Sequence, residues 1–306
     1  MFSLIIVMNG KEIIDVALKQ AKKQARAKKR WKEADLVKIN SIHAITLGYL
    51  NNYIRETSVE LTDFQKKLAE TMIDVKEKNN EIQRIKASIR ILKKLKDEYE
   101  MKLKYGDSPK QNKQVMKEYI GRYSSVVKKI RTSEIDKFLK KLNTLPKIKE
   151  MSTIILAGYP NVGKSQFLKT ATGHKVRTAP YPFTTKEILI GYVKNRYDKV
   201  QLIDTPGLLD RPFEKRNKTE QKAVLALKYL SKNVLFLIDA SETCGYSLKE
   251  QENLLKEIKK QFNPKLVVIA TKIDLPHKEV KSDYKVNATD KKQVQEVLKE
   301  VMKKFF

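Results

Sequence analysis

The sequence is poor in the residues on which disulfide-rich, collagen-like and low-complexity proteins depend. One cysteine among 306 residues excludes a disulfide framework, and 10 glycines with 9 prolines exclude collagen-like repeats and Gly/Pro-rich disordered chains. Acidic residues are also scarce, because 36 aspartates and glutamates accompany 64 lysines and arginines. The resulting net charge of +28 is larger than solubility requires and predicts a polyanionic partner.

Long hydrophobic runs are missing as well. No apolar segment approaches the roughly 20 residues that a transmembrane helix needs, and the largely apolar residues 1–8 lack the basic start of a signal peptide. We therefore expect a soluble, cytoplasmic protein with no membrane partner, and the single cysteine fits a reducing compartment. With 41% hydrophobic residues over a length typical of about two domains, the chain can bury a substantial core.

The first half of the chain has a helical pattern. A periodic stretch begins near Thr62 or Asp63 and ends at Tyr105, which predicts one helix roughly 65 Å long. A helix of that length needs other helices along it. These are expected at residues 12–31, 32–56, 109–131 and 133–142. We expect residues 1–148 to form an all-α, elongated helical bundle domain that binds RNA.

The second half, residues 149–306, has a different pattern. Short apolar runs suit strands that are buried on both faces of a sheet, and they occur at residues 153–157, 200–203, 234–238 and 266–270. Helical stretches separate these runs. Alternating strands and helices predict an α/β domain with a mostly parallel, doubly wound sheet.

Residues 158–165 fit the pattern G-x-x-x-x-G-K-[ST] directly after the first predicted strand. The pattern is typical of a P-loop, in which backbone amides and a helix N-terminus hold phosphates. Lys164 is expected to reach the β and γ phosphates, and Ser165 is expected to bind Mg²⁺. The predicted nucleotide contacts in this loop are Asn161, Val162, Gly163, Lys164, Ser165 and Gln166.

The run at residues 200–203 delivers Asp204, followed by Gly207, to the tip of a strand. An acidic residue there can hold Mg²⁺, and the glycine amide can sense the γ phosphate. Between the two motifs, a proline-punctuated loop ends in Thr184 and Thr185 and suits a switch segment that contacts the nucleotide. The predicted metal ligands are Ser165, Thr185 and Asp204, and the predicted catalytic residues are Lys164, Asn161, Thr185 and Gly207.

A pattern suited to guanine recognition follows the last long apolar run. Thr271, Lys272 and Asp274 stand at the tip of that predicted strand. One carboxylate there can accept both the N1 proton and the exocyclic amine of guanine, a donor pair that adenine lacks, so Asp274 favours GTP over ATP. After the final strand, a backbone amide could contact the guanine carbonyl. The amide of Ala288 is predicted to make that contact, and the predicted nucleotide-binding residues of this segment are Asn287, Ala288 and Thr289.

Taken in order, these five elements resemble the translation-factor class of P-loop GTPases. A finer match lies in GYPNVGKS at 158–165, PYPFTTK at 180–186, IDTPGLLDRP at 203–212 and SETCGY at 241–246. This set is similar to the nucleolar GTP-binding protein 1 (Nog-type) branch of the Obg-HflX group. The chain looks like a short, archaeal-type member in which Thr271 replaces the more usual asparagine.

The resemblance implies an assembly factor for the large ribosomal subunit that binds ribosomal RNA and hydrolyses GTP to GDP with Mg²⁺. Ribosomal proteins or other assembly factors are further expected partners, and the chain is expected to be a monomer. Two alternatives stay open. The helical domain could be a protein-interaction scaffold on a GTPase, or the chain could be a stand-alone P-loop phosphotransferase, against which Asp274 argues.

The predicted site lacks the glutamine that orients the attacking water in many GTPases. Efficient GTPases often place a glutamine directly after the Asp-x-x-Gly element to orient water, and here that position is Leu208. We therefore expect slow unstimulated hydrolysis, on the order of 10⁻³ s⁻¹ or less. Asn161 stands where some relatives hold K⁺, so a role for K⁺ stays open. The charged residues 210–217 beside this element are the expected relay to the helical domain.

Overall fold

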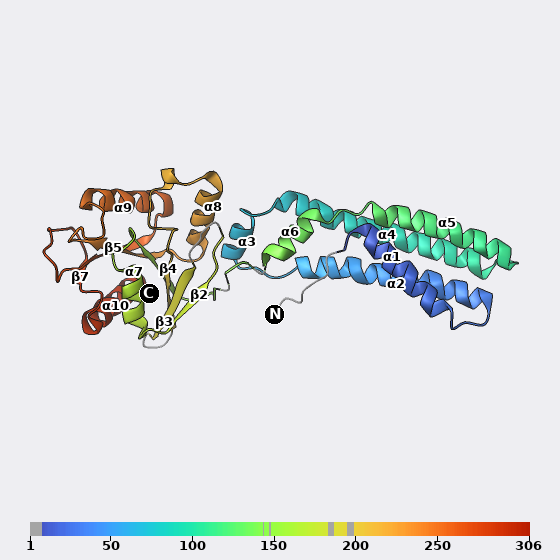
Figure 1. Ribbon diagram of the computed structural model, residues 1–306, viewed down its shortest axis with the longest axis horizontal. Coiled ribbons are helices and arrows are strands. Elements are labelled where there is room, and N and C mark those ends of the chain that lie inside the picture. Colours follow the sequence, from blue (N-terminus) through green and yellow to red (C-terminus); the bar gives the residue numbers. More distant parts are fainter. Residues whose placement is uncertain (1–7, 143, 147, 183–186, 195–198) are drawn as a thin grey trace. The chain divides into compact units, whose positions relative to one another are not determined.

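The computed structural model in Figure 1 describes residues 8–142, 144–146, 148–182, 187–194 and 199–306. The chain forms two compact units, Met1–Glu60 with Met72–Asn143, and Leu61–Thr71 with Thr144–Phe306. The sequence predicts a division at residue 148. In the structure the short segment Leu61–Thr71 packs with the second unit, while the chain on both sides of it belongs to the first.

The first unit is the helical bundle that the sequence predicts. Its helices are α1 (Gly10–Ala25), α2 (Trp31–Thr57), α4 (Val75–Lys104), α5 (Pro109–Lys128) and α6 (Ser133–Leu142). Figure 1 shows α1, α2, α4 and α5 running side by side. Their shared core is apolar and aromatic, and includes the buried residues Leu50, Ile85, Leu92, Tyr119 and Tyr123. Among the described residues, no helix has both the length and the apolar character needed to cross a membrane.

A buried acidic residue joins α4 to the start of α6. The Glu81 carboxylate accepts hydrogen bonds from the amides of Glu134 and Ile135, both at 3.0 Å, and from Ser133 Oγ at 3.0 Å. The first amides of a helix have no partner within it, and a carboxylate at that end also complements the helix dipole. Glu81 is therefore a polar link between two helices of the bundle.

The predicted single helix from residue 62 to 105 is wrong, because the structure divides it into α3 (Asp63–Ala69) and α4. Helix α3 starts at its own capping box, with Thr62 as N-cap. Helix α4 starts afresh at Asp74, whose side chain accepts the Glu77 amide at 2.9 Å. The apolar pattern continues across the break, but it serves two helices that pack in different compact units.

The second unit is built on a sheet that has seven strands in the described part of the chain. These are β1 (Thr153–Ala157), β2 (Val176–Ala179), β3 (Ile188–Lys194), β4 (Lys199–Asp204), β5 (Asn233–Asp239), β6 (Lys265–Thr271) and β7 (Tyr284–Val286). Their order is β2-β3-β4-β1-β5-β6-β7; the pairs β2–β3 and β3–β4 are antiparallel and the others parallel. The four strands expected from sequence are β1, β4, β5 and β6, and the mostly parallel sheet is confirmed.

Helices cover both faces of this sheet (Figure 1), with α7 and α10 on one side and α8 and α9 on the other. Their bounds are α7 (Lys164–Thr172), α8 (Lys218–Ala226), α9 (Leu248–Phe262) and α10 (Lys291–Phe305), and short 3₁₀ turns span Phe213–Lys215 and Leu227–Tyr229. Because β1, β4, β5 and β6 are parallel, their carboxyl ends meet at one edge of the sheet, where ligands of such folds bind.

Helix α3 adds a piece of the helical half to the second unit. Phe64 of α3 is buried, and its ring centroid lies 6.2 Å from that of Tyr181. The Tyr181 hydroxyl in turn donates to the Ala223 carbonyl of α8 at 2.7 Å. Helix α3 thus contacts Tyr181, which precedes residues 183–186 in the sequence; those residues contain part of the predicted switch and lie outside the described residues.

Candidate nucleotide-binding site

The loop between β1 and α7 requires glycine at two places. Gly158 has a φ of +132°, and a Cβ atom there would come within 2.3 Å of the Leu237 carbonyl oxygen. Gly163, the N-cap of α7, has a φ of +101°. A side chain at either position would be strained. The glycines therefore let the loop turn sharply into the N-terminus of α7, where backbone amides favour an anion.

Lys164 lies where the sequence predicts a phosphate contact. The residue is buried, and its Nζ donates to the carbonyl oxygens of Gly158 at 2.8 Å and Tyr159 at 2.7 Å. These bonds hold the ammonium group inside the curve of the loop. From that position a lysine of a P-loop reaches the phosphates.

The other predicted residues of this loop differ in their surroundings. Asn161 is exposed and has a φ of 62°, so its side chain is accessible to a ligand or cation. Val162 is fully buried. Gln166 is exposed on α7, where its Nε2 donates to Thr170 Oγ1 at 3.1 Å.

The start of α7 and the end of β4 together form a candidate metal site. The Ser165 hydroxyl donates to the buried Asp204 carboxylate, whose second oxygen, Oδ1, has no hydrogen-bond partner among the described residues. Burial raises the pKa of Asp204, an effect that Lys164 and Ser165 oppose. A hydroxyl and a carboxylate with an unpartnered oxygen are the hard oxygen ligands that Mg²⁺ prefers, so the pair fits this metal. Thr185, the third predicted ligand, and Thr184 lie outside the described residues.

The segment after β4 folds against the P-loop. Leu208 and Leu209 are both buried, and the Leu209 carbonyl accepts the Gly158 amide at 3.0 Å. Arg216 is also buried and donates to the carbonyl oxygens of Gly207 at 2.9 Å and Leu208 at 2.7 Å. Arg216, expected from sequence only as part of a charged relay, thus clamps the backbone of this segment.

Gly207 is the predicted sensor of the γ phosphate. In the structure its amide donates to the Asp210 carboxylate at 2.6 Å, and its φ of +80° favours glycine. Asp210 is buried, and one of its oxygens lies 4.0 Å from the Arg216 guanidinium. The amide that would contact a phosphate is therefore already directed at an anion, the carboxylate three residues further on.

The predicted guanine loops are joined to the P-loop by buried hydroxyl groups. The Thr271 hydroxyl lies 2.7 Å from the Val162 carbonyl oxygen and 3.1 Å from that of Ile238. On the other side, Thr170 of α7 donates to the Ala288 carbonyl at 2.8 Å. The structure thus brings the end of β6 and the loop after β7 to the P-loop, and Thr271 keeps a polar link to it where asparagine is more usual.

The other residues predicted to contact the base have different surroundings. Asp274 is exposed, three residues beyond Thr271. The Asn287 side chain accepts the Thr289 amide at 2.9 Å and the Thr289 hydroxyl at 2.7 Å. These two bonds shape the turn that carries Ala288, as local asparagine and threonine bonds do in other turns.

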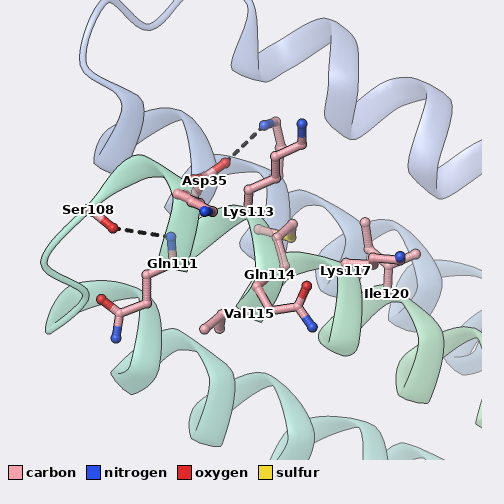
Figure 2. Close-up of a pocket in the computed structure, with 11 residues that line it drawn as sticks. Asp35, Ser108, Gln111, Lys113, Gln114, Val115, Lys117 and Ile120 are labelled. Atoms are coloured by element: carbon pink, nitrogen blue, oxygen red, sulfur yellow. Dashed lines mark hydrogen bonds and ion pairs between the residues drawn. The ribbon is translucent and has the colours of Figure 1, made fainter.

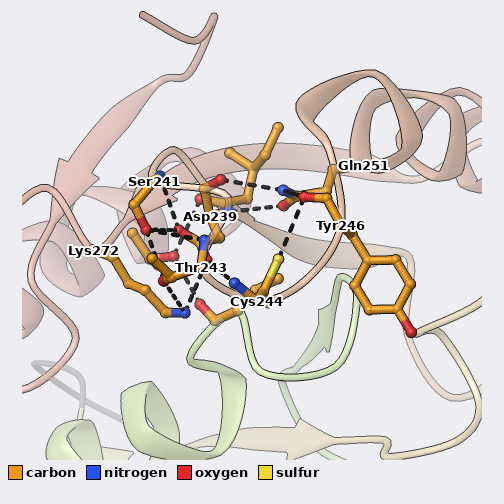
Figure 3. A network of polar contacts seen from close by, with 10 residues as sticks. Asp239, Ser241, Thr243, Cys244, Tyr246, Gln251 and Lys272 are labelled. Atoms are coloured by element: carbon orange, nitrogen blue, oxygen red, sulfur yellow. Dashed lines mark hydrogen bonds and ion pairs between the residues drawn. The ribbon is translucent and has the colours of Figure 1, made fainter. Parts of the chain in front are cut away.

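Lys272 is held by a polar network that the sequence reasoning missed (Figure 3). Its Nζ donates to Asp239 Oδ2 at 2.8 Å and to Thr243 Oγ1 at 2.9 Å. Asp239 ends β5, is fully buried, and also accepts the amides of Ser241 at 2.9 Å and Cys244 at 2.7 Å. Burial alone would raise the pKa of Asp239, but the bonds from Lys272, Ser241 and Cys244 hold it below its usual value.

The same loop also contacts the P-loop. The ring of Tyr246 stacks on that of Tyr159, with centroids 4.1 Å apart. Gln251 of α9 fixes the loop from behind, since it accepts the Asp239 amide at 2.8 Å and donates to the Tyr246 carbonyl at 3.0 Å. The SETCGY motif, noted in the sequence only as a resemblance, was the available signal for this network.

Comparisons with known proteins cover both halves of the chain. Residues 153–272 match the family described as 50S ribosome-binding GTPase, and residues 2–151 match the family described as NOG1 N-terminal helical domain. An uncharacterised protein of Methanocaldococcus jannaschii is 39% identical, over 79% of this chain and 69% of that protein. Nucleolar GTP-binding protein 1 of Arabidopsis thaliana is 31% identical, over 97% of this chain and 46% of its own length. That of Drosophila melanogaster is 42% identical, over 58% and 28%. The chain spans less than half the length of these two named relatives.

Proposed function

We propose, on the premise that this chain belongs to the nucleolar GTP-binding protein 1 family, that it is a GTP-operated switch that binds ribosomal RNA and acts in assembly of the large ribosomal subunit. One observation carries the nucleotide part of the proposal. The P-loop, Asp204 and the loops after β6 and β7 lie at one edge of the sheet, where Ser165 bonds to Asp204, Thr271 to Val162 and Thr170 to Ala288. This order of parts suits a guanine nucleotide with Mg²⁺.

Different residues of the site would bind the phosphates, the metal ion and the base of GTP. Lys164 and the amides at the start of α7 would bind the β and γ phosphates, and Ser165 with Asp204 would hold Mg²⁺. Bound Mg²⁺ supplies positive charge that neutralises the phosphates during transfer to water. Asp274 would accept the guanine donors, and Ala288 would offer its amide to the guanine carbonyl.

Unstimulated hydrolysis should be slow. Leu208 and Leu209 are aliphatic and buried, so neither can orient a water molecule. Single-turnover hydrolysis measured in KCl and in NaCl at equal ionic strength tests both the rate and the proposed role of Asn161. Equal rates in the two salts would remove K⁺ from the proposal, and rapid unassisted turnover would show that another group positions water.

The base specificity distinguishes this proposal from a stand-alone phosphotransferase. Asp274→Asn should weaken GTP binding because one carboxylate that accepts two donors is lost. If the variant kept full GTP binding, or if the wild type bound ATP as tightly as GTP, the guanine assignment would be wrong. Direct titration with both nucleotides measures these affinities.

The ribosomal part of the proposal is supported by the net charge of +28 and by membership of the nucleolar GTP-binding protein 1 family. Its test is crosslinking of the protein to RNA in native cells, with sequencing of the attached RNA, for the wild type and Lys164→Ala. Enrichment on discrete helices of large-subunit RNA that changes in the variant is the expected result. Diffuse or absent RNA would favour the alternative in which the helical domain is a protein-interaction scaffold.

A further inference from the structure

The helical unit contains a groove whose charge is almost entirely positive. It has a volume of about 1240 Å³ and is formed by α2 and the first half of α5 (Figure 2). Four lysines line it, namely Lys38, Lys110, Lys113 and Lys117. The one carboxylate in its lining, Asp35, lies 2.9 Å from the ammonium group of Lys38.

Three of these lysines form a stripe along one side of α5. Lys110, Lys113 and Lys117 are spaced three and four residues apart, so they project from one face of the helix. All three are exposed, and among the described residues none of them is paired with a carboxylate. Like charges on one helix face repel one another. A bound polyanion would relieve that repulsion.

The start of α5 adds to the positive field. Ser108 is the N-cap, and its hydroxyl accepts the Gln111 amide at 3.2 Å. The first turn contains no acidic residue, although acidic residues are the usual complement to the positive end of a helix dipole, and it carries Lys110 instead. The groove therefore combines a helix dipole and lysines of the same sign.

An exposed aromatic residue stands at the entrance to α5. Tyr105 is 74% exposed and lies three residues before Ser108. The turn between them is tightly packed, because Asn112 donates to the Leu103 carbonyl at 3.0 Å and a Cβ on Gly106 would come within 1.8 Å of Asn112 Oδ1. The tyrosine is thus presented on a firm base, as in aromatic platforms on which unpaired bases stack.

We propose that this groove binds single-stranded RNA, with phosphates on Lys110, Lys113 and Lys117 and a base stacked on Tyr105. The inference rests on the proposed function, since it names the surface through which the helical unit would bind RNA. Val115 and Ile120, which also line the groove, offer apolar surface to sugars and bases. An acidic peptide could use the lysines but would gain less from an aromatic platform.

The test is binding of the purified full chain to a fluorescein-labelled single-stranded RNA of mixed sequence at several salt concentrations. A triple variant, Lys110→Gln with Lys113→Gln and Lys117→Gln, should bind at least tenfold more weakly. Each phosphate contact contributes about 0.7 to the slope of log affinity against log salt, so the loss of three contacts should reduce the steepness of that slope by about 2. The matched control removes the same charge from exposed lysines of α4, namely Lys86→Gln with Lys93→Gln and Lys94→Gln. This control should lose far less affinity for the RNA than the groove variant.

The aromatic contact has its own signature. Tyr105→Ala should weaken binding about tenfold with an unchanged salt slope, because stacking releases no counterions, and Tyr105→Phe should bind like the wild type.

Equal losses of affinity in the α5 and α4 triple variants would show that RNA binds through diffuse charge. That result would overturn the groove as the binding site while leaving RNA binding in place. Full displacement of the RNA by poly-glutamate at equal charge concentration would also overturn it. A wild type that binds no RNA would instead remove the proposed function itself. An unchanged helical circular-dichroism spectrum in every variant verifies that the helical unit is folded.

Discussion

Two buried aspartates end the strands on either side of β1, and they differ in almost every other respect. Asp204 lies beside the P-loop, at what we call the proposed phosphate end of the site. It accepts one side-chain hydrogen bond, from Ser165, and its Oδ1 has no partner among the described residues. Asp239 lies beside Lys272, at the proposed guanine end of the site, and accepts hydrogen bonds from Lys272 and from the amides of Ser241 and Cys244. Both carboxylates are fully buried, so the difference lies in their partners and not in their exposure.

The pKa directions of the two groups follow from these partners. Burial raises the pKa of Asp204, whereas the donors around Asp239 outweigh burial and hold its pKa below the usual value. A buried carboxylate without enough donors is costly unless a cation arrives. Asp204 therefore keeps an oxygen that suits the proposed metal ion, whereas Asp239 already holds Lys272 and the loop at 241–244.

The largest expected effect lies at the phosphate end. Lys164→Ala removes the charged contact to the phosphates and should weaken GTP binding by up to about 100-fold, the range for a charged hydrogen bond. Lys169→Ala, at an exposed position of the same helix, is the matched control and should bind normally. Titration with a fluorescent GTP analogue measures both. Equal affinities in the two variants would contradict the assignment of Lys164.

Asp204→Asn should separate stability from metal binding. The neutral amide removes a buried charge with an unpartnered oxygen, so the melting temperature of the nucleotide-free protein should rise by a few degrees. The same change should abolish most of the Mg²⁺ dependence of GTP binding. A lower melting temperature together with an unchanged response to Mg²⁺ would mean that Asp204 is a structural residue like Asp239.

Asp239→Asn should lower the stability of the protein, whereas Asp204→Asn should raise it. Loss of the buried partner of Lys272 should lower the free energy of unfolding by about 3 kcal/mol and weaken GTP binding about tenfold. Because the pKa of Asp239 is lowered by folding, its stabilisation is complete above the unfolded pKa and is lost as the pH falls through the folded value. The variant should therefore lose less stability than the wild type on acidification.

A control on the same loop sharpens this prediction. Glu242 pairs with the exposed Lys278, and Glu242→Gln should destabilise the protein much less than Asp239→Asn does, as is usual for surface pairs. Thermal unfolding at several pH values and GTP titration apply to both variants. If the two variants lost equal amounts of stability and GTP affinity, the buried Asp239 would contribute no more than an exposed carboxylate.

The smallest expected effect is at the link between the two ends. Thr271→Val keeps the shape of the side chain but removes the hydroxyl beside the Val162 carbonyl, which should cost about 1 kcal/mol of stability and a few-fold in GTP affinity. Thr271→Ser retains the hydroxyl and should stay closer to the wild type. A serine variant as impaired as the valine variant would assign the role of Thr271 to its methyl group.

Much of the phosphate end could be predicted from the sequence, because its parts are local. The spacing of Gly158, Gly163 and Lys164 encodes the P-loop, and Asp204 ends a recognisable strand. The pattern also predicted the helices of the bundle, but it joined α3 to α4, since apolar periodicity does not reveal which neighbour a helix will meet. Phe64 has the same apolar character whether it packs in the bundle or, as observed, beside Tyr181.

The sequence alone determined the order of the elements, the phosphate loop and the large excess of positive charge, because each depends on residues close together in the chain or on composition. Three features became visible only in the tertiary structure. Asp239, unlike Asp204, is surrounded by hydrogen-bond donors, Arg216 holds the backbone of the segment after β4, and α2 and α5 form a lysine-lined groove. These features join residues that are distant in sequence. Their energies depend on burial and on the identity of the partner, which a linear pattern does not record.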